Sequence, residues 1–422
     1  MNSIIKTDKY ISDNSSHACC KVNIFNKIVL FVTVLISVTP ILNQQFSKII
    51  WSILIALWYI VVVCERRNQR FHYFSFSCLI LIWILWEITL KVFGFSSASI
   101  GNYFLLITFF DMIIKSLYVQ QYYSNKEKRI LLRLIQIIIA VNIISNIYVG
   151  YIYSNIHYYV YFYPEQYLNL NVAQTEFYNM LAFFIGANFF LVQKEKNKIC
   201  KVFDVFLIIL SYYFILNFET RTTSLIMSFI LILLIIINRN PSKLRKILKT
   251  ILFITFFSSI FLIEFDFIIR YLPERVAVRI SAVINHDTFI NSEYTSRVGL
   301  FFNGVRTMFS SLPNFIFGVG NHLGSDYSSI IGQHSLISDY MAKYGLLGLL
   351  FLLYFFSSIK KVFCNLKTNH FVSEYNKIVI FVFIIISFLS NSFRSETAVV
   401  VFLILSAINE SAQQTNVNVE VK

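Results

Sequence analysis

The chain contains few charged residues for its length. Asp, Glu, Lys and Arg make up 14% of the 422 residues, hydrophobic residues make up 57%, and the mean hydropathy is +0.65. A single water-soluble core cannot bury that much apolar surface, so the composition excludes an ordinary soluble domain. It predicts a membrane protein that crosses the bilayer several times.

Glycine and proline are also scarce, with 12 and 5 residues respectively, and apolar runs of about 16 to 22 residues separate the charged clusters. These runs predict membrane helices, because a membrane β-barrel shows shorter segments of alternating polarity. No self-similar period is visible, which counts against a transporter built from repeats. The expected fold class is an all-α polytopic helix bundle.

Twelve membrane spans are expected, although several are short for a hydrocarbon core of about 30 Å. They lie at residues 28–42, 49–64, 73–90, 103–119, 130–152, 177–192, 202–218, 222–237, 251–269, 335–357, 378–393 and 397–408. The domain division follows from them: a tail at 1–27, spans one to nine at 28–269, a large periplasmic loop with amphipathic helices at 270–333, spans ten to twelve at 334–408, and a tail at 409–422.

The net charge of +14 does not indicate nucleic-acid binding, because the basic residues cluster in alternate connections between the apolar runs. Membrane proteins keep Lys and Arg on the cytoplasmic side. This rule places both termini in the cytoplasm and the long 270–333 connection on the outside.

The basic residues left on the outer side are mostly arginines, whereas those inside are mostly lysines. A guanidinium grips phosphate oxygens with a planar fork, which an ammonium cannot do. Arg221 lies between two apolar runs and is flanked by Thr220 and Thr222, so we expect it at the outer membrane surface, bound to a ligand or paired with Glu219.

The long outer connection contains further arginines. In RYLPERVAVRISAVI, Arg275 and Arg279 lie one turn apart on an amphipathic helix, which explains them equally well as membrane-surface residues. A second helix is expected after Ser292, running toward Pro313. On that helix Arg297 and Arg306 are about half a turn out of phase, so they cannot both face one pocket.

The stretch GVGNHLGSDYSSIIGQHSLISDYMAKYGLLGLL begins at Gly318 and places His334 where a polar segment meets an apolar helix. A helix N-terminus attracts phosphate and disfavours the imidazolium form of a histidine. A neutral imidazole can accept a proton as a general base. The alternative is a histidine that only caps the helix.

The chain resembles the superfamily of bacterial O-antigen polymerases and O-antigen ligases. The resemblance covers roughly residues 205–360 and rests on ETRTTSL, SRVGLFF followed by PNFIFGVGNH, and QHSLISDYMAKYGLLGLL. It differs from the family pattern at Ser335, where an asparagine usually follows the histidine.

The resemblance implies a GT-C-like fold in the bacterial inner membrane with a periplasmic active site. Arg221 and Arg297 would hold the lipid diphosphate, His334 would prepare the acceptor, and Gly318 and Gly320 would form a turn, with Gly345 and Gly348 on a packing face. Arg275 and Arg279 are secondary candidates for the diphosphate site. The implied reaction is inverting and needs neither a metal nor another cofactor.

The implied substrate is an oligosaccharide on undecaprenyl diphosphate, transferred onto a new lipid-linked repeat unit. Membrane lipid, a chain-length regulator and a flippase are the expected partners, and nucleic acid is not. Two alternatives stay open: a ligase that transfers glycan to the lipid A core, and a transporter or flippase with no glycosyl transfer. Asp111 with Lys115, and Asp339 with Lys343, are spaced as structural pairs, and Glu87, Glu264 and Asp266 have no assigned role.

Overall fold

We analysed a computed structural model of the chain. It describes residues 24–45, 53–55, 57–60, 62, 85, 88–89, 92, 111–120, 122–153, 170–173, 175–217, 222–238, 304–319, 335–364, 370–389 and 397–411. Within these residues the protein consists of helices and turns and contains no strand, as the apolar runs predict.

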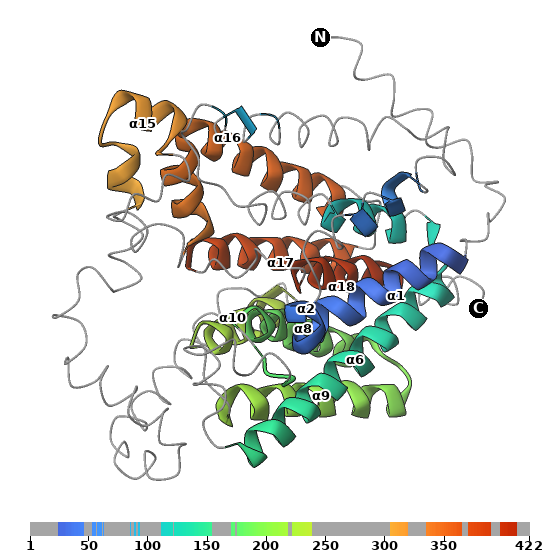
Figure 1. Ribbon diagram of the computed structural model, residues 1–422. Coiled ribbons are helices and arrows are strands. Elements are labelled where there is room, and N and C mark those ends of the chain that lie inside the picture. The colour runs from blue at the N-terminus through green and yellow to red at the C-terminus, as the bar shows by residue number, and fades with distance from the viewer. Residues whose placement is uncertain are drawn as a thin grey trace, which may run out of the picture.

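The described helices are arranged as a bundle (Figure 1). They are α1 (Ile24–Val38), α2 (Pro40–Gln45), α6 (Asn125–Ile152), α8 (Thr175–Lys194), α9 (Lys198–Asn217), α10 (Thr222–Asn238), α15 (Leu312–Phe317), α16 (Leu336–Cys364), α17 (His370–Leu389) and α18 (Thr397–Ser411). Further helical residues lie at 111–120 and 304–308.

Three described helices are long and apolar enough to cross a membrane: Asn125–Ile152, Lys198–Asn217 and Leu336–Lys360. Shorter apolar helices lie at Ile24–Val38, Ser224–Ile236 and Ala398–Ile408. Together they indicate a membrane protein, because their length and apolar composition suit the bilayer. An α-helix also satisfies its own backbone hydrogen bonds there, where no water is available. The expected span at 251–269 lies outside the described residues.

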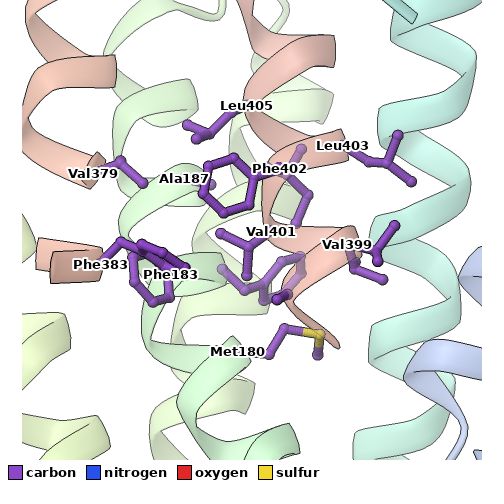
Figure 2. Close-up of a cluster of buried hydrophobic side chains, with 14 of the residues drawn as sticks. Met180, Phe183, Ala187, Val379, Phe383, Val399, Val401, Phe402, Leu403 and Leu405 are labelled. Carbon is purple, nitrogen blue, oxygen red and sulfur yellow. The ribbon is translucent and has the colours of Figure 1, made fainter. Parts of the chain in front are cut away.

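The core is centred on α18, a helix that is apolar on every side. Its residues from Ala398 to Ile408 are all buried, which is typical of a helix surrounded by others. Figure 2 shows Phe402 of α18 among Phe183 and Ala187 of α8 and Phe383 of α17. The rings of Phe402 and Phe383 meet edge to face, with centroids 5.1 Å apart. This packing joins α8, α17 and α18 into one unit.

The helices α9 and α6 lie at the periphery and expose apolar side chains. On α9 these are Ile199, Val202, Phe206, Ile209, Tyr213 and Leu216. Helix association within a membrane favours small residues that let two backbones approach closely. The bulky exposed stripe of α9 instead fits contact with lipid chains.

Polar side chains in the apolar helices pair with one another across the bundle. Lys115 Nζ lies 2.7 Å from Asp111 Oδ2 and donates to Thr33 Oγ1 of α1, and both charged side chains are buried. Farther along the bundle, Arg133 of α6 donates to Asp204 of α9, and Gln136 donates to Asn188 of α8. The spacing of Asp111 and Lys115 therefore predicted a pair that the fold does form, and such pairs fix which helices are neighbours.

The expected tenth span is not one continuous helix. At Gly345, α16 has φ 58° and ψ −141°, a conformation that breaks the helix into 336–344 and 346–364 (Figure 1). The second part alone would extend about 28 Å, enough to cross a hydrocarbon core of about 30 Å with its flanking residues. The first part turns aside from the second at Gly345.

Gly345 is expected to be required for this break. Replacing it with Ala forces an L residue into a conformation that only glycine adopts easily, at a cost of about 1 to 3 kcal/mol. The new methyl group would also meet Phe315 O at 2.6 Å. Gly345→Ala should therefore lower the melting temperature of the detergent-purified protein markedly.

Gly186→Ala is the matched control, because that glycine is helical and its Cβ would meet only the Leu231 side chain at 3.1 Å. Equal melting temperatures for the two variants would mean that the break at Gly345 is not needed for stability.

Candidate functional site

The start of α16 is capped by Ser335, so His334 directly precedes the cap residue. Ser335 Oγ accepts a hydrogen bond from Ser338 N at 3.2 Å, and Ser335 O accepts one from Asp339 N at 2.9 Å. His334 itself lies outside the described residues. The described contacts make Ser335 the capping residue, which removes the need for a histidine cap at this helix.

Ser335 also connects α16 to α17, because its hydroxyl donates to Ser387 O at 3.5 Å near the end of that helix. The helices α8 and α17 run antiparallel: Phe183 meets Phe383, and Phe190 meets Tyr375. Asn179, one turn before Phe183, is therefore level with Ser387.

The start of α10 is held at the same level. Ser224 Oγ donates to Asn179 Oδ1 at 2.9 Å, and Gly186 of α8 lies against Leu231 of α10 seven residues farther along both helices. We call Asn179, Ser224, Ser335 and Ser387 the polar layer; all four residues are buried. It marks the end of the bundle at which α8, α10 and α16 begin.

The polar layer sets a common level for two helices that follow distant sequence positions. Arg221 is three residues before Ser224, and His334 is next to Ser335. Arg221 lies outside the described residues, as do Arg275, Arg279, Arg297 and Gly320. The helices that follow Arg221 and His334 nevertheless begin at one level, which is the condition for a shared site.

A second described segment approaches the start of α16. Gly304 belongs to the helical residues 304–308, and its Cα lies so close to Ser338 that a side chain would collide with the serine hydroxyl. Met308, four residues later, is buried on the same face, whereas Arg306 is exposed. This agrees with the expectation that Arg306 points away from the pocket side of its helix.

Helical periodicity extends the argument to Arg297. Position 297 precedes Gly304 by seven residues, or nearly two turns, so a continuous helix after Ser292 would carry Arg297 on the face that meets α16. Residues 293–303 lie outside the described residues, and this remains a prediction.

The segment between Gly318 and Ser335 is attached to α16 at both ends. Gly318 has φ 74° and its backbone lies against Lys343 and Tyr344, while Val319 N donates to Ala342 O at 2.9 Å. Ala342 and Ser335 are about 10 Å apart along the helix. Gly318 has the positive φ that a turn needs, while its expected partner Gly320 lies outside the described residues, and the two anchors keep both ends of the histidine-bearing segment over the first part of α16.

Gly345 and Gly348 were expected only to lie on a packing face, but each has a more specific role. Gly345 forms the helix break, where a Cβ would lie 2.7 Å from Gly318 N, and a Cβ on Gly348 would lie 2.5 Å from Tyr340 O. The glycines thus let α15 and the two parts of α16 approach closely.

Four buried residues near the start of α16 and α10 do not stand out in the sequence: Asn179, Ser224, Ser338 and Ser387. Each is a small polar residue within an apolar run, and many such residues in this chain bond only to their own helix, as Ser406 does through Phe402 O. Only the pairing between helices distinguishes the residues of the polar layer.

Comparison with known proteins adds no identification: no protein-family model matches the chain, and no curated protein matches it.

Separate substitutions of Arg297 and Arg306 test which of the two arginines lies on the helix face toward α16. If the chain polymerises glycan as the resemblance implies, Arg297→Ala and Arg297→Lys should each reduce the amount of long glycan at least tenfold, because neither a methyl group nor a point charge can replace a bidentate fork. Arg306→Ala should stay within about twofold of wild type, since its side chain is exposed on the opposite face. The measurement is glycan chain length on a gel at matched protein level. Equal losses for Arg297→Ala and Arg306→Ala would contradict the arrangement.

Proposed function

We propose that the protein is a polymerase of a surface polysaccharide of the O-antigen type, acting at the periplasmic face of the bacterial inner membrane with twelve spans and both termini inside. The observation that carries the proposal is the polar layer. It holds the helix after Arg221 and the helix after His334 at one level, although these positions are 113 residues apart in the sequence.

The proposed reaction transfers the growing glycan from undecaprenyl diphosphate to the terminal sugar of a lipid-linked repeat unit. His334 accepts the proton of the acceptor hydroxyl, whose oxygen attacks the anomeric carbon of the donor sugar. The bond from that carbon to the diphosphate oxygen breaks, and lipid diphosphate leaves with the bonding electron pair. Attack opposite the leaving group inverts the anomeric centre.

The arginines stabilise the charge that develops on the departing diphosphate. Arg221 and Arg297 are the proposed donors, and removal of one preorganised donor in such a site typically costs a factor of about 10² to 10³ in rate. The geometry of Gly304 and Met308 supports Arg297 in this role, because both lie on the face toward α16. Arg275 and Arg279 are proposed as secondary contacts to the lipid-linked substrates.

The decisive experiment is the glycan ladder in a strain that lacks the protein. Wild type should restore a full ladder, and His334→Ala at matched expression should leave a single band of core plus one repeat unit. Arg306→Ala is the control, because that side chain is exposed and has no assigned role in the site, so its ladder should persist at an equal protein level. An unchanged ladder with His334→Ala would refute the catalytic role.

The same experiment distinguishes a polymerase from a ligase. Glycan that is absent from the lipid A core but accumulates as a lipid-linked polymer would identify a ligase. A core plus one repeat unit would instead identify a polymerase.

A transporter is the second candidate, because the described helices bury the ion pair of Asp111 and Lys115 with 0% and 2% of the side chains exposed. Charged residues inside a membrane bundle often mark a transport path. Here the pair bonds internally, and Lys115 also donates to Thr33. This arrangement favours a structural role.

Removing the pair tests that role. Asp111→Leu alone leaves a buried ammonium and should destabilise the protein by about 3 to 5 kcal/mol, whereas Asp111→Leu with Lys115→Met should be close to neutral. The double variant should therefore recover both the melting temperature and the glycan ladder. A stable double variant without a ladder would favour transport coupled to the pair.

A further inference from the structure

Asp339 is a buried carboxylate near the start of α16, and the proposed reaction does not use it. Only 5% of the residue is exposed, and it is the acidic residue in the first turn of the helix. A buried charge within a membrane bundle is kept where it is paired or where it serves a function. The sequence spacing predicts Lys343 as its partner, and the cap of α16 indicates a second candidate.

The cap determines which side chains meet at the start of α16. Ser335 is the cap residue, because its hydroxyl accepts from Ser338 N and its carbonyl accepts from Asp339 N, the first bond of the helical ladder. Counted from this cap, Asp339 is the fourth residue of the helix, and His334 is the residue that precedes the cap. Side chains at these two positions pack against each other at helix starts. The described cap therefore predicts that the His334 imidazole lies against the Asp339 carboxylate.

The described elements that pack on α16 bring few other charges toward Asp339. The helix α15 carries no charged residue, and the helical segment before it carries only Arg306, which is exposed. On α17, Lys377 is ten residues before Ser387, or about 15 Å from the point where that helix meets the start of α16. Among the described residues within one turn on α16 itself, only Lys343 is cationic, and it is half-buried.

A carboxylate at this position supplies what a histidine at a helix start needs in order to act as a base. The positive end of the helix disfavours the imidazolium form, so the ring alone would accept a proton weakly. An adjacent carboxylate favours the charged ring. A hydrogen bond to one ring nitrogen also fixes the tautomer, and so decides which nitrogen faces the acceptor. The two opposing effects bring the proton affinity of the ring toward the range that suits a base at neutral pH.

We propose that Asp339 is the positioning residue of His334. Its carboxylate accepts a hydrogen bond from one ring N–H, and the other ring nitrogen takes the proton of the acceptor hydroxyl. The imidazolium that forms keeps its bond to Asp339 and releases the new proton to water after the lipid diphosphate has left. Asp339 stays ionised throughout and does not touch the sugar. The catalytic meaning of the pair rests on the proposed function, whereas the pair itself does not.

Labelling with diethyl pyrocarbonate, which acylates the neutral imidazole, tests the pair without an activity assay. The detergent-purified full chain is labelled briefly at a series of pH values, and mass spectrometry gives the extent of labelling at each of the seven histidines. The pH of half-maximal labelling of His334 should fall by about one unit in Asp339→Asn, because the carboxylate holds the ring in its protonated form. His370, at the opposite end of α17 from Ser387, should label as in wild type.

Lys343→Gln is the matched control, because it removes the partner that the spacing predicts and should not lower the labelling midpoint of His334. A midpoint unchanged by Asp339→Asn would overturn the proposal and leave the carboxylate to Lys343 or Arg297. If Asp339→Asn does not fold, the ring ¹⁵N signal that His334→Gln removes decides in the wild-type protein. A single tautomer is expected there, and a mixture of both would overturn the pair.

The glycan ladder is read separately on the same variants. Asp339→Asn should lower the rate of chain growth at least about tenfold, as loss of an orienting carboxylate does for other catalytic histidines. A shifted midpoint with an unchanged ladder in His334→Ala would keep the pair and reject the polymerase. A ladder lost in His334→Ala with an unshifted midpoint in Asp339→Asn would keep the polymerase and reject the pair.

Discussion

In an apolar environment each backbone N–H and C=O must find a partner within the protein, and this constraint governs the described structure. It makes the apolar runs helical, since a helix satisfies its own backbone. It also makes any interruption costly unless another segment compensates. The break at Gly345 illustrates the rule, because the backbone near Gly318 and Val319 packs directly against it.

The same constraint explains where polar side chains occur. A buried polar group costs free energy unless it is hydrogen-bonded, so each must be matched across or within helices. Lys115 with Asp111 and Thr33 joins the 111–120 helix to α1. Ser335 with Ser387, and Ser224 with Asn179, fix the level at which α16 and α10 begin. These bonds specify neighbours and register in a bundle whose apolar contacts alone are less directional.

The proposed chemistry depends on that register. A site for a lipid diphosphate and a sugar hydroxyl needs a base and cationic donors within a few Å of one another, and here they come from distant parts of the chain. The close packing of Gly304 on Ser338 and of Gly318 on α16 brings two parts of the long loop to the helix that starts beside His334. Glycine at these points matters because any side chain would push the segments apart.

The sequence by itself determined the helical, membrane-embedded character and the positions of most of the described helices. The expected spans at 222–237 and 177–192 closely match α10 and α8, because uninterrupted apolar runs in a bilayer leave the backbone little choice but a helix. The tertiary structure alone decided that Gly345 breaks α16, that α18 is central, and which serines form the polar layer. Glycines and serines in apolar runs look alike in sequence, and only the backbone or side chain that packs against each one, from a distant part of the chain, gives it a distinct role.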